Sequence, residues 1–319
     1  MQQHMVLVSY IEKLSNDILG FTLASATGRP LPEFQAGAHI DVHLPNGACR
    51  QYSLCNTYEK NGTYQIAVKL EPASRGGSVF LHESIAEGDI LQIGSPKNLF
   101  SLDPRARHAL LLAGGIGVTP ILSMARHLSA DGEPFTFEYF VRSREDAAFL
   151  DTLEEDPALR ANTNLAIGLT PEETTSRLTE ILADQVAGTH VYVCGPGPFV
   201  SAARKAAEHW SSGSVHFESF SAAEFQHTGQ DEEFEVVLAK TGRTLKVRDD
   251  QTIADTLKAE GVSVETSCGQ GICGTCRTEV LAGSPDHRDM ILSDSEKESR
   301  AVMMVCVSRA AGGTLVLDL

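Results

Sequence analysis

Long apolar runs are missing from this chain of 319 residues, which has no stretch of about 18 consecutive apolar residues. The N-terminus also lacks the basic-then-apolar pattern of a secretory signal. We therefore expect a cytoplasmic protein that does not associate with a membrane. Internal repeats and low-complexity segments are absent as well, and the length predicts two or three ordinary globular domains.

Basic residues are scarce relative to acidic ones. Lys and Arg together number 26 against 42 Asp and Glu, for a formal net charge of −16 at pH 7. Because binding to phosphate backbones needs a local excess of Lys and Arg, we expect no nucleic-acid partner. The acidic balance fits a protein partner with a basic docking patch, or solubility alone. We also expect a monomer.

Strand and helix patterns divide the chain into three domains and a linker. Residues 1–102 hold six short strand-like segments separated by turns, which predict an antiparallel β-barrel. Residues 103–224 alternate apolar strands with helical segments and predict a parallel α/β sheet. Residues 225–233 have the composition of a linker. Residues 234–319 mix strands with one helix, for which Thr252 is the expected N-cap.

The cysteines cluster near the C-terminus. Of seven in the chain, four follow the spacing C-x4-C-x2-C with one distant member: Cys268, Cys273, Cys276 and Cys306. Such clustering indicates metal or redox chemistry. Zinc sites usually need a second close pair, and a redox dithiol needs only the C-x2-C pair. The spacing is that of plant-type [2Fe–2S] ferredoxins, and the glycines of CGQGICGTC permit a tight loop around the cluster. It favours [2Fe–2S], with zinc and unligated thiols as alternatives.

Two segments of the expected barrel carry groups suited to a flavin. RQYSL (50–54) lies on an expected strand, and SRGGS (74–78) precedes an expected helix. A flavin needs a cation and N–H donors for its phosphate, and an aromatic and a hydroxyl beside its ring. A purely structural role for a Tyr and a Ser on a strand is the alternative. The residues suited to a flavin are Arg50, Tyr52, Ser53, Arg75, Gly76, Gly77 and Ser78.

Two glycine-containing turns suit a nicotinamide nucleotide. AGGIGVTP (113–120) lies between an apolar strand and a helix, where backbone N–H groups can hold a pyrophosphate. VYVCGPGPF (191–199) supplies a second turn at a strand end, where ligands of open α/β sheets bind. Tight packing alone would also explain these glycines, and burial of a small residue would explain Cys194. Arg142 and Arg144 suit an NADP phosphate and Asp146 an NAD ribose, so these residues leave the coenzyme open.

In this order, RQYSL, RGGS, AGGIGVTP, CGPGPF and the cysteine pattern resemble the phthalate dioxygenase reductase family, the class IA reductases of Rieske-type oxygenase systems. Within that family, RQYSLCN, SRGGS, CGQGICGTC, PDHRD and TLVLDL are most similar to the vanillate O-demethylase reductases. The resemblance implies an FMN-binding β-barrel, an NAD(H)-binding α/β domain and a plant-type ferredoxin (β-grasp) domain. Electrons would pass from NADH through FMN and the [2Fe–2S] cluster to a terminal Rieske-type oxygenase that demethylates or hydroxylates an aromatic compound. The short phosphate turn favours FMN over FAD.

The resemblance also implies roles for individual residues. Ser53 would stabilise charge near the flavin N5, while Cys194 and Phe220 would shape the nicotinamide pocket; a core role suits Phe220 equally. The implied metal ligands are Cys268, Cys273, Cys276 and Cys306. The implied cofactor-binding residues are Arg50, Gln51, Tyr52, Ser53, Leu54, Val68, Lys69, Arg75, Gly76, Gly77, Ser78, Gly114, Gly115, Ile116, Gly117, Thr119, Pro120, Cys194, Gly195 and Pro196.

Other functions would use parts of the same machinery. A reductase serving a different redox partner, without a Rieske oxygenase, would carry the same motifs. An electron carrier or redox sensor without hydride chemistry needs no nucleotide site, so the two glycine-containing turns argue against it. A zinc-bearing regulatory protein is the remaining alternative, and it would be colourless.

Overall fold

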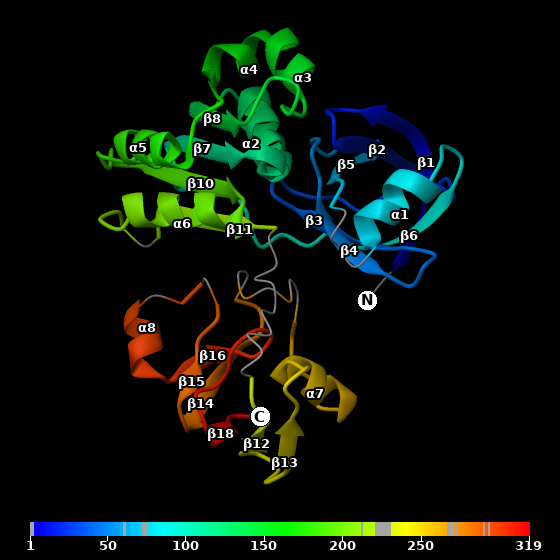
Figure 1. Cartoon of the computed structure of the whole chain (residues 1–319). Coiled ribbons are helices and arrows are strands. Elements are labelled where there is room, and N and C mark those ends of the chain that lie inside the picture. The colour runs from blue at the N-terminus through cyan, green and yellow to red at the C-terminus, as the bar shows by residue number, and fades with distance from the viewer. Residues whose placement is uncertain are drawn as a thin grey trace. The chain divides into compact units, whose positions relative to one another are not determined.

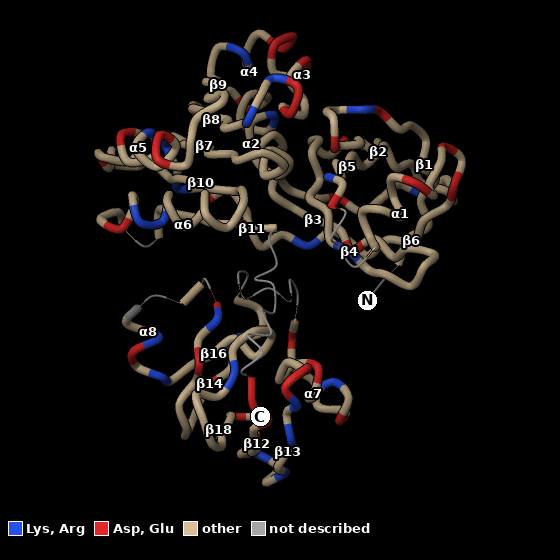
Figure 2. The backbone as a smooth tube through the Cα atoms, viewed as in Figure 1, with Lys and Arg blue, Asp and Glu red and all other residues tan. Residues whose placement is uncertain are grey.

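The computed structural model describes residues 3–59, 62–71, 76–211, 213–220, 231–266, 269, 271, 274–289, 291–292 and 294–319. Two compact units make up the chain, residues 1–220 and residues 221–319 (Figure 1). Acidic residues occur along both units (Figure 2). In the part of the chain so described, no helix has the length and apolar character needed to cross a membrane.

The first sheet is antiparallel and has six strands in the order β4-β3-β6-β1-β2-β5. Its two outer strands meet, because Leu54 bridges Ile66 and the Cys55 N–H donates to the Gln65 carbonyl at 2.8 Å. The sheet therefore closes into the predicted barrel. Its elements are β1 (Gln3–Lys13), β2 (Ile18–Ser25), β3 (His39–His43), β4 (Cys49–Ser53), β5 (Tyr64–Lys69), α1 (Gly77–Ser84) and β6 (Ile90–Gly94).

The second sheet is parallel and has five strands in the order β11-β10-β7-β8-β9, with helices on both faces (Figure 1). β7 is buried along its length except at His108, as its continuous apolar run predicts. The elements are β7 (His108–Gly114), the 3₁₀ turn η1 (Gly115–Gly117), α2 (Val118–Asp131), β8 (Phe135–Val141), α3 (Leu150–Glu155), α4 (Pro157–Asn162), β9 (Thr163–Ile167), α5 (Pro171–Ile181), β10 (Thr189–Gly195), α6 (Gly197–Ala206) and β11 (Val215–Ser219).

The barrel and the parallel sheet share one hydrophobic core. Ile18 and Ala67 of the barrel belong to the same buried cluster as Leu111 of β7 and Ile121 of α2. Hydrogen bonds join them too: Arg126 Nη1 of α2 donates to the Cys55 carbonyl at 2.9 Å, and Ser123 Oγ donates to the Asn56 carbonyl at 2.9 Å. Residues 1–220 thus form one unit although they contain two sheets.

The second unit has a mixed sheet in the order β13-β12-β18-β14-β16. β12 and β18 are parallel and the other pairs are antiparallel, which is the predicted β-grasp arrangement. Thr252 caps α7 as predicted, because its hydroxyl accepts from the Asp255 N–H at 3.0 Å. The elements are β12 (Phe234–Leu238), β13 (Thr244–Val247), α7 (Ile253–Ala259), β14 (Arg277–Ala282), β15 (Pro285–Asp286), α8 (Asp294–Ser299), β16 (Val302–Met304), β17 (Arg309–Ala310) and β18 (Thr314–Leu317).

Buried arginine contacts hold the first described residues of the second unit. Arg309 is only 2% exposed, and its guanidinium donates to the carbonyls of Glu232, Arg248 and Gln251 at 2.8–3.1 Å. Arg288 donates to both carboxylate oxygens of Asp231, at 2.6 and 3.1 Å. The chain is therefore fixed to the ferredoxin-like sheet from Asp231 onward.

Candidate functional site

The flavin residues expected on β4 alternate between two faces of the strand. Ser53 is 4% exposed, and its hydroxyl is buried without a hydrogen-bond partner among the described residues. A buried hydroxyl without a partner costs free energy, so this group suits a bound polar ligand. Tyr52 packs partly against the barrel core, and burial raises the pKa of its hydroxyl to about 12. That hydroxyl therefore remains a hydrogen-bond donor at physiological pH.

Arg50 lies against the start of α1, which brings the two flavin segments together. A Cβ at Gly77 would lie 2.7 Å from Arg50 Cγ and 2.8 Å from Nε, so a larger residue at this point would displace the Arg50 side chain. Gly76 precedes the helix with φ at 81°, a left-handed value. A guanidinium beside a helix N-terminus suits a phosphate. Arg75 lies outside the described residues.

The remaining residues predicted to bind flavin are buried in the barrel core or bonded to other protein groups. Leu54 and Val68 are buried in the barrel core. Gln51 Nε2 donates to Asp41 Oδ1 at 2.9 Å, on the opposite face of β4 from Arg50. Lys69 forms ion pairs with two acidic residues, with Nζ–O distances of 3.0 and 3.8 Å. Ser78 is buried, and its Oγ accepts from the backbone N–H of residue 71 at 3.1 Å.

The two nucleotide turns are in direct contact at the carboxyl ends of β7 and β10. A Cβ at Gly117 would lie 2.2 Å from the Cys194 carbonyl oxygen, and one at Gly114 would lie 3.1 Å from Pro196 Cδ. A Cβ at Gly195 would lie 2.7 Å from the ring of Phe199. Packing thus accounts for these three glycines. It also brings both turns to the edge of the sheet where nucleotides bind.

Gly115 differs from the other glycines of its turn. Its φ is 53°, and its Cβ position faces open space. Backbone freedom and an unfilled position are what a pyrophosphate approaching the turn requires. Ile116 packs beside the shared core, Thr119 Oγ1 donates to the Ile116 carbonyl at 3.1 Å, and Pro120 is buried in α2. These contacts fix the turn that follows β7.

Cys194 and Phe220 lie near the ends of adjacent strands. Cys194 is fully buried, and burial, with a smaller contribution from the charge of Glu218, raises the pKa of its thiol well above the usual value. The Cys194 side chain is therefore a neutral thiol and not a thiolate nucleophile. Phe220 is half-buried against the shared core. The sequence prediction missed Glu218, which pairs with Cys194 across β10 and β11. The available signal was an acidic residue beside Phe217, near the carboxyl end of β11.

Arg144 is engaged within the protein. Its guanidinium forms an ion pair with Glu154 of α3. The carbonyl of Arg142 lies 3.6 Å from the Cβ position of Gly168, so the two strand ends of β8 and β9 are close. The ion pair engages the Arg144 guanidinium, and both of its side chains are about half exposed.

Two of the four cysteines predicted to be metal ligands lie within the described part of the second unit. Cys276 Sγ and Cys306 Sγ are 3.1 Å apart and at most 5% exposed. Two thiolates on one tetrahedral metal, with bonds of about 2.3 Å, lie about 3.8 Å apart, so these neighbouring sulfurs would have to separate by about 0.7 Å to bind one metal atom. Gly271 and Gly274 have φ of 71° and 75°, as a wrapping loop needs. Cys268 and Cys273 lie outside the described residues.

Comparisons with known proteins agree with this arrangement. Three family models match: an oxidoreductase FAD-binding domain over residues 5–101, the N-terminal domain of a DmmA-like dimethylamine monooxygenase subunit over 95–213, and a 2Fe-2S iron-sulfur cluster binding domain over 236–311. A vanillate O-demethylase oxidoreductase from a Pseudomonas species is 43% identical over 98% of this chain and 99% of its own. A phthalate dioxygenase reductase from Burkholderia cepacia is 40% identical over 97% of this chain and 95% of its own.

Solved structures of similar proteins have the same overall fold. A phthalate dioxygenase reductase, described as a modular structure for electron transfer from pyridine nucleotides to [2Fe-2S], superposes with a TM-score of 0.76 at 39% identity, covering 99% of this chain and 98% of its own. An intact type IV self-sufficient cytochrome P450 monooxygenase superposes with a TM-score of 0.77 at 38% identity, covering 99% of this chain and 41% of its own.

Fold and site together define an electron-transfer reductase with a flavin-binding barrel and a [2Fe–2S] domain. The chain belongs to the phthalate dioxygenase reductase family.

Proposed function

We propose that the chain is an NADH-dependent reductase that holds FMN and a [2Fe–2S] cluster and reduces a terminal Rieske-type oxygenase acting on an aromatic compound. The buried, unpartnered hydroxyl of Ser53 carries this proposal. The residues that follow it, Cys55 and Asn56, are hydrogen-bonded to α2, the helix that begins at the nucleotide turn. Hence a flavin beside Ser53 would lie next to the nucleotide turn. We propose domains at 1–102, 103–224 and 234–319, with a linker at 225–233.

Each group of residues has a separate task in this reductase. Bound FMN supplies two-electron acceptance with one-electron release, and the cluster carries single electrons. Arg50 and the start of α1 hold the flavin phosphate, and Ser53 donates a hydrogen bond beside the flavin ring. The turn at Gly115 receives the pyrophosphate of NADH. Cys194, whose thiol is kept neutral by burial, packs against the nicotinamide without adding charge.

The cluster and the coenzyme preference follow from local contacts. The proximity of Cys276 Sγ and Cys306 Sγ supports the proposal that they bind one metal atom, and Cys268 with Cys273 would complete the ligand set. The ion pair of Arg144 with Glu154 favours NADH, because a guanidinium already paired with a carboxylate attracts a 2′-phosphate less.

A second partner class is favoured by one comparison. In the type IV self-sufficient cytochrome P450 monooxygenase, the part that resembles this chain makes up 41% of a longer protein. The same reductase arrangement therefore occurs joined to a P450, and a haem protein is the alternative electron acceptor. Names of the full-length relatives, which belong to vanillate and phthalate oxygenase systems, favour the Rieske-type partner.

Anaerobic rapid mixing with NADH and with NADPH tests the chemistry. We expect loss of flavin absorbance with NADH, followed by partial loss of cluster absorbance, and FMN among the flavins released by acid. Reduction of the flavin by NADPH alone would refute the coenzyme assignment, and a colourless protein would refute the whole proposal. Product formation with purified oxygenase components, compared with reduction of a P450, then distinguishes the two partner classes.

A further inference from the structure

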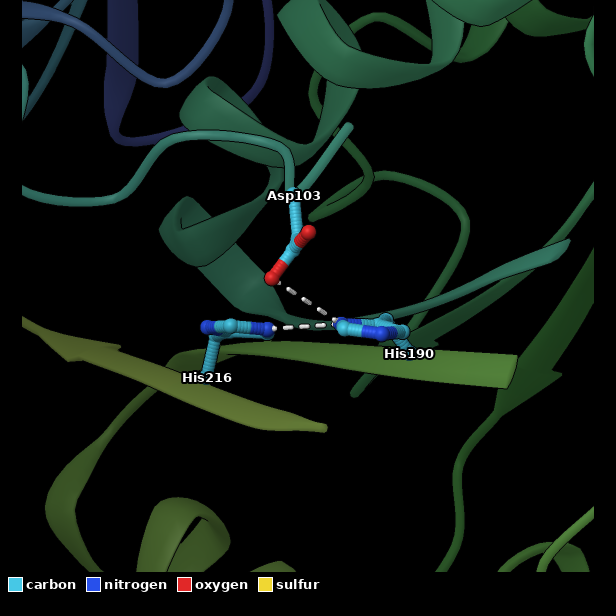
Figure 3. A group of neighbouring side chains, drawn as sticks. All are labelled: Asp103, His190 and His216. Atoms are coloured by element: carbon cyan, nitrogen blue, oxygen red, sulfur yellow. Dashed lines mark hydrogen bonds and ion pairs between the residues drawn. The ribbon is translucent and has the colours of Figure 1, made fainter. Parts of the chain in front are cut away.

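Three side chains of residue types that can bind metals converge at the amino-terminal ends of β10 and β11, away from the residues assigned above (Figure 3). His190 is the second residue of β10 and His216 the second residue of β11. Asp103 belongs to the segment between β6 and β7, which connects the barrel to the parallel sheet. Their candidate ligand atoms all lie within 4.8 Å of one another. The described residues contain no other group of His, Cys, Asp and Glu with this property.

Two of the three distances are close to those of a cation site, and the third, between the ligand atoms of Asp103 and His216, is at most 4.8 Å. His190 Nδ1 lies 3.1 Å from His216 Nε2 and 3.9 Å from Asp103 Oδ2. Ligand atoms on one tetrahedral zinc ion, with bonds of about 2.0–2.1 Å, lie about 3.3 Å apart. His190 is thus within reach of both partners at close to the spacing that a shared ion requires.

The two imidazoles are held in place by ring contacts, with His190 Nδ1 facing His216 Nε2. Their rings stack with centroids 5.4 Å apart and planes 13° apart, and the ring of His216 stacks on Tyr192 at 4.7 Å. Two protonated rings would set two N–H donors against each other across 3.1 Å, so at least one ring nitrogen in the contact carries a lone pair. Tyr192 also accepts a hydrogen bond from the Asp103 N–H at 2.7 Å, which fixes the third ligand.

We propose that Asp103, His190 and His216 form a binding site for a divalent cation of the zinc class, separate from the flavin, nucleotide and iron–sulfur sites. Two imidazoles and one carboxylate suit zinc, whereas calcium and magnesium prefer oxygen ligands alone. A water molecule would complete a tetrahedral set. The ion would tie the segment between barrel and sheet to two strands of that sheet.

The site lies too far from the nucleotide turn to take part in hydride transfer. His190 and Gly195 are five residues apart on β10, which at about 3.3 Å per residue places them about 16 Å apart. The ion would therefore stabilise residues 1–220 without a catalytic role.

Arg105 competes with the ion. Its guanidinium is largely exposed, and it donates to Asp103 Oδ1 at 2.9 Å and to Oδ2 at 2.6 Å. Because Oδ2 is the oxygen nearest His190, a bound cation would share this oxygen with the guanidinium, and the two positive charges would repel each other. Removing Arg105 should therefore strengthen binding, which a purely structural group of histidines would not show.

Zinc titration of the tag-free holoprotein, with X-ray absorption at the zinc edge, tests the proposal. We expect one zinc ion per chain bound by N and O ligands at about 2.0 Å. The change His216→Gln should weaken binding about 10-fold or more, Asp103→Asn should do the same, and Arg105→Gln should strengthen it. His127→Gln is the matched control, because His127 also faces an aspartate, Asp131, at 3.6 Å but on the surface of α2.

Three outcomes would overturn the site. They are no zinc uptake at about millimolar concentration, equal affinity in the wild type and the His216→Gln variant, and a zinc–sulfur distance of about 2.3 Å, which would place the ion among cysteines. Asp103→Asn, which keeps the shape of the side chain, decides the matter if the histidine variant does not fold. The temperature of flavin release gives an independent readout, since zinc should raise it in the wild type and not in Asp103→Asn.

Discussion

Adding a single methyl group at Gly117 should slow flavin reduction by NADH and leave the fold and the flavin content unchanged. In Gly117→Ala the new Cβ would lie 2.2 Å from the carbonyl oxygen of Cys194 and 2.7 Å from the backbone nitrogen of Gly195. An ordinary contact is about 3.5 Å, so the two turns must move apart by roughly 1 Å. Overpacking of this kind costs about 1–3 kcal/mol, which leaves the unit folded. A shift of about 1 Å in a reacting group can, however, lower a rate about 10²-fold.

Flavin reduction measured by stopped flow is the appropriate assay. We expect Gly117→Ala to be reduced by NADH about 10²-fold more slowly than the wild type, while dithionite reduces both proteins equally and their flavin contents match. Gly213→Ala is the control, because its Cβ position is open and lies before β11, at the opposite end of the sheet. Wild-type rates in Gly117→Ala would refute the argument that contact between the turns sets the nucleotide geometry.

Four further outcomes follow from the described contacts. Ser53→Ala should keep its flavin but slow flavin reduction by NADH about 10²-fold, as loss of a donor to developing charge does, and an unchanged rate would exclude Ser53. Cys306→Ser should lose the cluster's electron paramagnetic resonance signal while flavin reduction persists; a retained signal would contradict the ligand assignment. Arg309→Leu should destabilise the second unit by about 3–5 kcal/mol in urea, because buried carbonyls lose their donor, and a change below 1 kcal/mol (about the size of a surface contact) would count against this. Between pH 7 and 9, iodoacetamide should label the exposed Cys49 before Cys194, since burial raises the pKa of the Cys194 thiol and keeps it protonated throughout this range. Peptide mass spectrometry measures the order of labelling, and labelling of Cys194 first would contradict this prediction.

Local patterns in the sequence were sufficient for much of the fold. The continuous apolar run of β7 predicted a strand covered on both faces, and Thr252 predicted the start of α7; both are confirmed. The cysteine spacing predicted a plant-type [2Fe–2S] domain, which the family model over residues 236–311 confirms. These features depend on neighbours within a few residues or on a fixed ligand spacing, so a single sequence contains them.

Features that depend on strand register could not be predicted. Glu218 lies beside Cys194 only because β11 pairs with β10 in one particular register. Likewise, the cluster around His190 requires the connecting segment to cross the starts of two strands. Both explanations for the glycines apply, each to a different residue. The Cβ position of Gly117 is occupied by the Cys194 backbone, as tight packing predicts, whereas the Cβ position of Gly115 faces open space, as a nucleotide site predicts. Choosing between them needs three-dimensional distances.

The core shared by barrel and parallel sheet limits how this reductase can be divided. Buried apolar residues such as Cys55 and Phe100 of the barrel half lie in the same cluster as Tyr139 and Met124 of the nucleotide half. A cut near residue 102 would expose that surface on both fragments, and each would tend to aggregate. Protein engineers who exchange electron-transfer modules should therefore transplant residues 1–220 as a single piece. By the same reasoning, gene fusions that bring this flavin barrel to a new partner must carry its nucleotide sheet along.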